Sequence, residues 1–393
     1  MKTIHALGCA IILTTGCAST EYYISDANTV KIDVTEALRT PSKCLENEAN
    51  QVKVIQLETS EKTLVEEIKT LQIDDDRIFI LDRLNKGSII IFDTDGNFIK
   101  RIPTGQGPGE ITLASYMYYD PHSKLLYVHD ESRQTVLSYD SDGNFLSSFQ
   151  LNALGEGIAI DGDKILLIQH NFQSKENGNT IKLVSFDTKG NGDISRSWNL
   201  GKEDEVFSGL MTSTGCFQSV DNGFSIRKQF DRELLYFKDD TIKKRYQIID
   251  ENYHMDFSKY KGVIDMYNNL SNDDFIFSGT TYETKDIMYL CFFTRGLRSV
   301  SVYYDKSNGK VWSYKTKSHS FANKLMPRGV YDYNANVFFS ILRPEFFCKT
   351  DTDYSWDGTN MDGKISDEDM EKLRSIKPDD NPIIVLFKLK DNI

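Results

Sequence analysis

One short pattern recurs six times along this chain and constrains its fold more than any other feature. In each copy an apolar run ends in an aromatic residue, and a polar turn follows. The copies read IIIFDTDGN, VLSYDSDGN, LVSFDTKGN, LLYFKDD, SVYYDKSNG and IVLFKLKDN, and their aromatic residues are Phe92, Tyr139, Phe186, Phe237, Tyr304 and Phe387. The DG and KG dipeptides predict tight hairpins, because glycine adopts positive φ without the steric cost of a Cβ atom.

A second apolar run precedes each of these copies. The six runs are RIFILD, LLYVHD, KILLIQH, GFSIRK, MYLCFF and VFFSIL. Each has the length of a buried strand, and a further extended stretch lies before it. Four strands joined by turns, with a shortest repeat of about 47 residues, are typical of a propeller blade. A two-sheet sandwich is the alternative, but it does not explain six copies of one unit.

The two ends of such a ring must join. The last apolar run, NPIIVLFKL, is followed by too few residues to supply an outer strand. The segment VKVIQLE at 52–58 alternates apolar and polar residues and precedes the first repeat. We therefore predict an all-β, six-bladed β-propeller of four-stranded antiparallel blades over residues 51–393. The N-terminal strand would close the ring in the last blade and remove two free strand edges.

The N-terminus has the features of a targeting segment. A lysine at position 2 is followed by the apolar run ALGCAIIL, and LTTGC ends at Cys17. The run is too short to span a bilayer. It resembles a bacterial lipobox, although Leu13 lies one place further from the cysteine than in the usual pattern. The resemblance implies a signal peptide at 1–16, acylation of Cys17 and a tether at 17–50. An ordinary secretory signal with an incidental cysteine is the alternative.

Charge and cysteine content limit the partners. The formal net charge is −12 and no basic stripe is evident, which argues against nucleic acid as a partner. Contact with a membrane is expected only through the lipid anchor. The cysteines of the predicted mature chain beyond Cys17 show neither CxxC nor metal-ligand spacing, so we expect no required disulfide; they are Cys44, Cys216, Cys291 and Cys348.

The repeats carry a family resemblance. The FDxDGNF turns and IFILD-like strands resemble NHL-type six-bladed propellers. The lipobox, the GxGPGE loop after the first blade and the terminal DNPIIVLFKLK resemble the six-bladed β-propeller lipoproteins of gut-type diderm bacteria. The resemblance covers the chain from about residue 50 to its end. It implies the fold and a place in the cell envelope, but no activity, because most members have no assigned biochemistry.

The glycine-rich stretch TGQGPGE at 104–110 has two interpretations. A phosphate loop requires a helix N-terminus after it, whereas ITLASYMYYD, which follows here, is strand-like. We therefore predict a sharp corner between two blades, with a special φ at Gly109 and with Glu110 bonded to backbone N–H groups. Anion binding is the alternative.

Metal sites are suggested at two places. Asp82, Asp130 and Asn171 follow or end second strands and could converge at the channel mouth, as in propeller lactonases, or could stabilise turns. The segment 357–369 places Asn360, Asp362 and Asp369 at positions of a calcium loop, but Gly358 stands at the first position. Alternatively, Ser366 begins a helix with Asp369 in a capping box. No HExxH or GxSxG motif is present.

The remaining candidate is a binding face. Long insertions in repeat folds collect on one face, and we expect the insertion at 343–380 to cover part of the channel mouth. The ends of the second strands carry six residues that would ring this mouth: Arg83, Glu131, His170, Arg227, Arg295 and Arg343. Converging guanidinium groups suit carboxylates or sulfates, and so an acidic glycan. Alternatively, each arginine pairs with a local acid such as Asp82, Asp231 or Glu345.

These features predict a lipid-anchored, non-enzymatic envelope module that binds a ligand or a protein and needs no cofactor apart from the possible calcium. Two other functions stay open. One is an envelope enzyme of the lactonase or lyase type with a metal in the channel. The other is a structural partner in a larger envelope complex.

Overall fold

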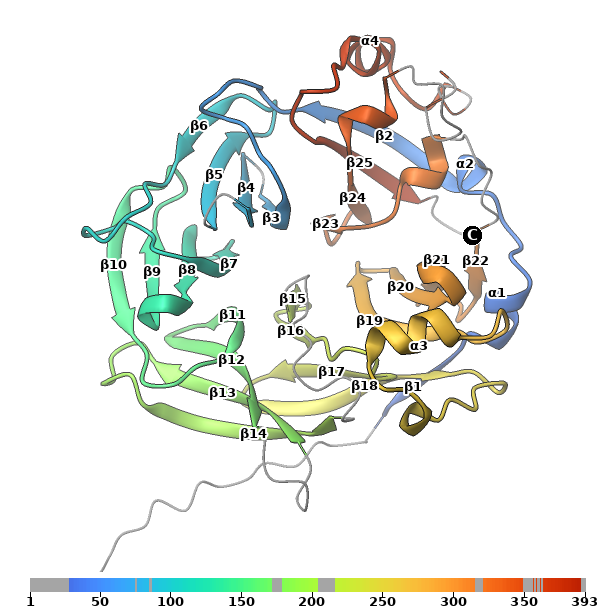
Figure 1. Cartoon of the computed structure of the whole chain (residues 1–393), viewed down its shortest axis with the longest axis horizontal. Coiled ribbons are helices and arrows are strands. Elements are labelled where there is room, and N and C mark those ends of the chain that lie inside the picture. The colour runs from blue at the N-terminus through green and yellow to red at the C-terminus, as the bar shows by residue number, and fades with distance from the viewer. Residues whose placement is uncertain are drawn as a thin grey trace, which may run out of the picture.

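A computed structural model of the chain confirms the propeller. It describes residues 28–74, 76–84, 87–171, 179–203, 216–314, 321–348 and 363–389, together with residues 356, 358 and 361. Six sheets are arranged in a ring around a central channel (Figure 1). The six predicted aromatic residues are all buried, at the ends of the third strands. None of the described helices is long and apolar enough to cross a membrane.

The first three blades follow the chain in order. Blade 1 consists of β3 (Ile68–Ile73), β4 (Arg77–Asp82), β5 (Ser88–Asp93) and β6 (Phe98–Arg101). Blade 2 consists of β7 (Ala114–Asp120), β8 (Leu125–Asp130), β9 (Thr135–Tyr139) and β10 (Phe145–Gln150), with η1 (Glu131–Arg133) after β8. Blade 3 consists of β11 (Glu156–Asp161), β12 (Lys164–Asn171), β13 (Asn179–Asp187) and β14 (Ile194–Glu203).

The other three blades carry the insertions. Blade 4 consists of β15 (Phe217–Val220), β16 (Gly223–Ile226), β17 (Glu233–Lys238) and β18 (Thr241–Ile249). The crossing to blade 5 contains η3 (Phe257–Lys259) and α3 (Val263–Asn269). Blade 5 consists of β19 (Ile276–Glu283), β20 (Ile287–Thr294), β21 (Arg298–Asp305) and β22 (Val311–Ser313), with η4 (Arg295–Leu297) after β20 and η5 (Phe321–Lys324) after β22.

Blade 6 closes the ring as predicted. Its strands are β23 (Gly329–Asp332), β24 (Val337–Leu342), β25 (Ile383–Leu389) and the N-terminal β2 (Ala49–Gln56). β2 pairs antiparallel with β25, from Ala49 opposite Leu389 to Gln56 opposite Ile383. The observed strand begins three residues before the predicted segment, because α2 (Leu45–Glu48) leads directly into it.

The prediction of a tether as far as residue 50 is wrong for its described part. β1 (Val30–Asp33) adds a fifth, parallel strand to blade 4 beside β18. α1 (Thr35–Arg39) then buries Ala37 and Leu38 in a cluster with residues of blade 5. Residues 30–48 therefore form a strap along the outer rim of blades 4 to 6 (Figure 1). Cys17 and the signal segment lie outside the described residues.

The hairpin turns follow the predicted chemistry with one exception. Asp93 Oδ1 accepts hydrogen bonds from the backbone N–H groups of Asp95 and Asn97, and Asp140 repeats this arrangement in blade 2. The glycines of both DG dipeptides have positive φ. In blade 3 the positive φ belongs to Gly192 rather than to Gly190 of the KG dipeptide, because the turn there is longer.

The TGQGPGE stretch is a corner between blades 1 and 2. The Glu110 carboxylate accepts a hydrogen bond from the Gly107 N–H at 2.8 Å, as predicted. Gly109 has a φ of 73°, and a Cβ at this position would lie 2.6 Å from the Cβ of Phe145. A β-strand follows the corner rather than a helix, so no helix N-terminus is available for an anion.

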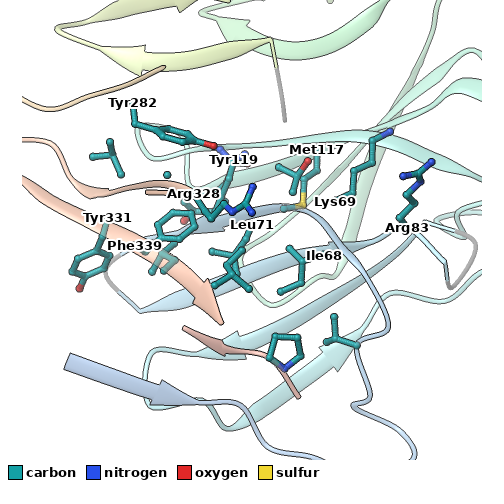
Figure 2. A pocket seen from close by; sticks show the side chains of 18 of the residues that line it. Ile68, Lys69, Leu71, Arg83, Met117, Tyr119, Tyr282, Arg328, Tyr331 and Phe339 are labelled. Carbon is teal, nitrogen blue, oxygen red and sulfur yellow. Dashed lines mark hydrogen bonds between the residues drawn. The ribbon is translucent and has the colours of Figure 1, made fainter. Parts of the chain in front are cut away.

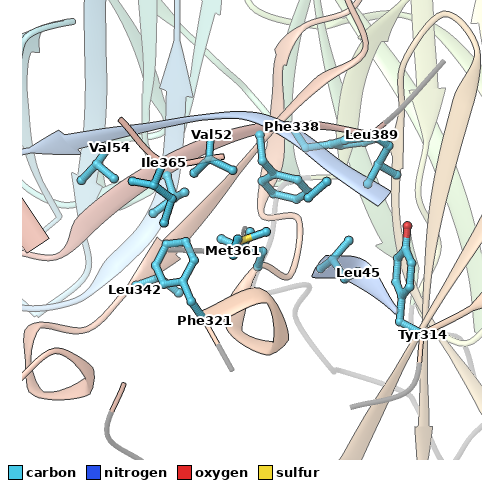
Figure 3. Packing of buried hydrophobic residues seen from close by; sticks show 14 of the residues in the cluster. Leu45, Val52, Val54, Tyr314, Phe321, Phe338, Leu342, Met361, Ile365 and Leu389 are labelled. Atoms are coloured by element: carbon cyan, nitrogen blue, oxygen red, sulfur yellow. The ribbon is translucent and has the colours of Figure 1, made fainter. Parts of the chain in front are cut away.

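The insertion between β24 and β25 contains η6 (Pro344–Phe346) and α4 (Asp367–Ser375). α4 lies at the outer rim of blade 6 and does not cover the channel (Figure 1). The two ends of the insertion do reach the channel, as expected, because Glu345 and Asp380 line it. The segment instead packs Met361 and Ile365 into the cluster that contains Val52 and Val54 of β2 (Figure 3). The insertion therefore packs against β2, the strand that closes the ring, and stabilises it.

Candidate functional site

The first strands of all six blades line a cavity of about 950 Å³ in the central channel (Figure 2). Its wall is rich in tyrosine, with rings from blades 2, 5 and 6: Tyr116, Tyr118, Tyr119, Tyr282, Tyr331 and Tyr333. A concave site with aromatic walls and a few polar groups is the usual form of a small-molecule site. The cavity is therefore the candidate site, and its charged residues decide which ligand it suits.

Besides Arg83 and Arg343, three basic residues line the cavity, and we call them the cationic belt: Lys69, Arg227 and Arg328. The Arg328 N–H donates to the carbonyl of Phe339, in the middle of β24, so Arg328 lies below the end of that strand, where Arg343 follows. Lys69 lies in β3 at the level where Leu81 and Asp82 pair with this strand. Arg227 follows the four-residue β16, whereas Arg83 follows the six-residue β4. At about 3.3 Å per residue, Arg227 is therefore about two residues deeper than Arg83.

The belt is held against aromatic rings. Lys69 Nζ lies 4.5 Å from the centre of the Tyr116 ring, and the Arg227 guanidinium lies 4.7 Å from that of Tyr282. Arg227 Nη2 also donates to Gln218 Oε1 at 3.3 Å. Such contacts orient a cation without neutralising its charge. Lys69 can therefore still attract an anion.

Burial affects the protonation of the belt and of its wall. Loss of hydration lowers the pKa of both Lys69 and Arg227. Burial also raises the pKa of the Tyr282 hydroxyl, and the positive charges of Arg227 and Arg328 partly offset this rise. Within the described part of the chain, no carboxylate lies within ion-pair distance of Lys69 or Arg328 (a limit of 4.0 Å). An anionic ligand would supply the missing counter-charge.

One buried histidine beside the belt is uncharged at neutral pH. His129 is fully buried, and burial lowers its pKa to about 4. Its ring stacks on that of Tyr116 with a centroid separation of 6.2 Å. Neither ring nitrogen has a hydrogen-bond partner among the described residues. His129 therefore adds no charge to the wall behind Lys69.

The entrance above the belt has the opposite charge. Four carboxylates line it, and we call them the acidic mouth: Glu66, Glu67, Glu345 and Asp380. Arg83 and Arg343 also line this end of the cavity, and Arg83 pairs with Glu67 at 3.3 Å. Glu131 and Glu156 lie close enough to Lys69 to raise its pKa against the effect of burial. The cavity thus has cations at mid-depth below an acidic rim.

The predicted ring of six residues does not form at one level. Arg83 and Arg343 line the entrance, and Arg227 lines the cavity below it. The other three residues do not line the cavity. Glu131 accepts a hydrogen bond from Ser115 at 2.6 Å, His170 lies 3.4 Å from Glu156, and Arg295 is exposed in η4. Strand length explains part of this, because Arg227 follows the four-residue β16 and Arg295 the eight-residue β20, whereas Arg83 and Arg343 follow strands of six residues. It does not explain Glu131, which also follows a six-residue strand.

Local pairing, which was the alternative to a binding ring, holds for Arg83, whose partner is Glu67, whereas two of the acids expected as partners bind other groups. Asp82 accepts hydrogen bonds from the backbone N–H groups of Glu66 and Glu67, and it stabilises the entry to β3. Asp130 does the same for Thr112 in blade 2. Asp231 pairs with Lys228. Asp82 and Asp130 therefore have the turn-stabilising role that was the alternative to metal binding.

The calcium prediction receives no support from the described part of the segment. Asn360 and Asp362 lie outside the described residues, as does the side chain of Asn171. Asp369 accepts a hydrogen bond from the Val54 N–H at 3.1 Å and pairs with Lys372 at 2.9 Å. Ser366 Oγ accepts from the Asp369 N–H, as in the predicted cap, but the Asp369 carboxylate bonds to β2 rather than back to Ser366. Among the described residues, no three His, Cys, Asp or Glu side chains form a metal site.

Lys69 and Arg328 were missed because the sequence reasoning considered only the ends of second strands. Both lie on or beside first strands, which face the channel in a propeller. A charged residue within EIKTLQI, and another directly before GVYD, would have been the signal. The depth of Arg328 could not be predicted, because it depends on the lengths of the neighbouring turns.

Comparisons with known proteins give a family and a fold. A family model described as "Domain of unknown function (DUF4934)" matches residues 29–388. A "Putative exported protein" from Bacteroides fragilis has a similar structure, with a TM-score of 0.67, 17% identity, and coverage of 92% of this chain and 100% of that chain. A member of the duf4221 family from Bacteroides vulgatus matches with a TM-score of 0.51, 12% identity, and coverage of 87% and 99%. No curated protein matches the chain. At these identities the structural likeness concerns the fold alone.

Proposed function

The chain belongs to the DUF4934 family, and we propose that it is a non-enzymatic module of the cell envelope that binds an acidic ligand, such as an acidic glycan, in its central channel. The family description carries no activity, so the proposal rests on the site. The observation that supports it most is the cationic belt, in which Lys69 and Arg328 have no ion-pair partner among the described residues.

The chemistry of the belt suits a carboxylate or a sulfate. A guanidinium presents a planar set of donors that can engage two oxygens at once. An ion pair gains strength in a partly dehydrated cavity, because the effective dielectric constant is lower than in water. The tyrosines provide apolar ring faces with polar tips, which suit the mixed surface of a sugar.

Calorimetry can test this function. We expect glucuronate or galacturonate to bind the wild type and the matched neutral sugars to bind much more weakly. Arg328→Gln and Lys69→Gln should each weaken binding of the acid by about 10-fold, the size expected for loss of a charge-assisted hydrogen bond. Binding should also weaken as salt rises.

Arg295→Gln is the matched control, because Arg295 is exposed outside the cavity. It should leave the affinity unchanged. Equal affinities in the belt variants and the control, or no heat from the wild type with any acid in the panel, would contradict the proposed function.

We propose in addition that the protein is anchored by lipid at Cys17. The lipobox-like LTTGC supports this, together with the exported character ascribed to the Bacteroides fragilis protein. Cys17→Ala should release the protein from membranes into aqueous extracts, since the acyl chains would be absent. Fractionation of cells that express each form would measure this. A variant that still requires detergent would show that Cys17 is not the anchor.

A further inference from the structure

We infer that the channel selects ligands with a single acidic group at one end and neutral sugars behind it, and that it rejects ligands with an acidic group on every sugar. This selectivity rests on the proposed function and adds a ligand class to it. It follows from the vertical order of charge in the cavity, with cations at mid-depth and carboxylates at the entrance.

The leading acidic group of the ligand would bind at the cationic belt. An acidic group that reaches the belt meets Lys69 and Arg328, neither of which has an ion-pair partner among the described residues. The Arg227 guanidinium also lines the cavity, where burial lowers its pKa and a nearby anion would favour its charged form. The belt therefore attracts the leading acidic group.

The part of the ligand that stays in the entrance would lie among carboxylates. Glu66, Glu67, Glu345 and Asp380 line that end of the cavity, with Arg83 and Arg343 as its only lining cations in the described chain. Arg83 is already paired with Glu67. A second acidic group at this level would lie among like charges, which disfavours the complex.

The carboxylates of the acidic mouth can accept hydrogen bonds from a neutral sugar. Ionised carboxylates are acceptors only, and sugar hydroxyl groups can donate to them. Glu66 and Glu345 are exposed, and in the described structure no ion pair or hydrogen bond involves the carboxylate of either. A neutral sugar linked to the acidic one would therefore find acceptors where a second acid would find repulsion.

Calorimetry with three ligands at low salt can test the inference. The ligands are a uronic acid linked to one neutral sugar, the diuronate of the same length, and the neutral disaccharide. We expect the single-acid disaccharide to bind the wild type at least 10-fold more tightly than the diuronate, and the neutral disaccharide to bind weakest. The preference should shrink as salt rises, because screening weakens the repulsion at the entrance.

The triple variant Glu66→Gln, Glu67→Gln, Glu345→Gln removes three charges of the acidic mouth. It should bind the diuronate more tightly and reduce the preference to about 3-fold or less. The matched control neutralises three exposed acids on α4, at the outer rim: Asp367→Asn, Glu368→Gln and Glu371→Gln. It changes the net charge equally and should leave the preference unchanged.

The outcomes separate the two proposals. If no acid binds the wild type, the proposed function fails. If acids bind but the wild type takes the diuronate as tightly as the single-acid disaccharide, the selectivity alone is overturned. The same holds if the α4 control reduces the preference as much as the mouth variant does, because net charge and not the entrance would then be the cause.

Discussion

The N-terminal segment adds two strands to the ring in opposite ways. β2 pairs antiparallel with β25 and supplies the fourth strand of blade 6. β1 pairs parallel with β18 and is added to blade 4, which already has four strands (Figure 1). Four of the eight β2 residues are buried, whereas only Ile32 is buried in β1. β2 completes a blade, whereas β1 covers the edge of a blade that already has four strands.

This difference shows that one continuous segment can contain both a required part of a fold and an addition to it. Without β2, blade 6 would have three strands, and the outer edge of β25 would be unpaired. Without β1, blade 4 would keep the four strands that define a blade. The two strands should therefore differ greatly in their effect on stability, and truncations can test this.

The largest effect is expected from a chain that begins at residue 57. It lacks the whole of β2, so the ring is open and the apolar side of β25 is exposed. We expect aggregation or loss of cooperative unfolding, relative to a chain that begins at residue 18. Urea unfolding followed by circular dichroism would measure it. A cooperative transition with an unchanged midpoint would show that β2 does not close the ring.

A smaller effect is expected from a chain that begins at residue 42, which keeps β2 but lacks β1 and α1. It loses the buried side chains of Ile32, Val34 and Leu38. Each is worth about 1.5–3 kcal/mol on burial, offset by the entropy of ordering the segment. We expect a net loss of about 2–5 kcal/mol in the free energy of unfolding, with cooperativity retained. A non-cooperative transition would place β1 in the required part of the fold.

The comparison also explains what the sequence could predict of the fold. The repeated hairpins and aromatic positions are local signals, and β2 alternates clearly over several residues, so both were found. β1 is short, and its partner Tyr246 lies more than two hundred residues away from Val30. The four letters VKID contain no sign of a parallel partner at that distance. α1 and α2 were missed for a similar reason, since their five and four residues are too few for a helical period.

The site was less predictable than the fold. The arginines at the ends of second strands can be read from the sequence, but their depth depends on strand length. The six-residue β4 and the four-residue β16 place Arg83 and Arg227 at different levels. The vertical order of charge, on which the proposed selectivity depends, therefore needs the register of each blade. The sequence alone gives the charged residues but not their depth in the cavity.

A point variant can sharpen the contrast at β2. Asp369 in α4 accepts a hydrogen bond from the Val54 N–H, in the middle of the closing strand. Asp369→Ala would leave that buried N–H without its acceptor, so we expect a loss of about 1–3 kcal/mol in the free energy of unfolding. Asp367→Ala is the control, because Asp367 is exposed at the start of the same helix. Chemical denaturation that gave equal losses for both would mean that the bond to β2 contributes little.

The smallest effect is expected where the strap meets blade 4. The Arg39 Nη1 atom lies 2.9 Å from Asp250 Oδ1, and the Asp250 side chain is only 1% exposed. Asp250 also accepts a hydrogen bond from the Asn252 N–H, so it keeps a partner when Arg39 is removed. Arg39 itself is partly exposed, which weakens the pair. We therefore expect Arg39→Ala to cost about 1 kcal/mol in the chain that begins at residue 18.

A double-mutant cycle can assign this cost to the pair. If the Arg39–Asp250 contact holds the strap on blade 4, Asp250→Asn should cost less in the chain that begins at residue 42, which has no Arg39, than in the longer chain. The difference between the two costs is the coupling energy between Asp250 and the deleted segment, in which Arg39 is the described residue that bonds to the Asp250 side chain. An equal cost in both chains would mean that Asp250 acts only on its own loop through Asn252. The strap would then be held by the pairing of β1 with β18 and by the apolar contacts of Ile32, Val34 and Leu38, and its attachment would depend little on salt.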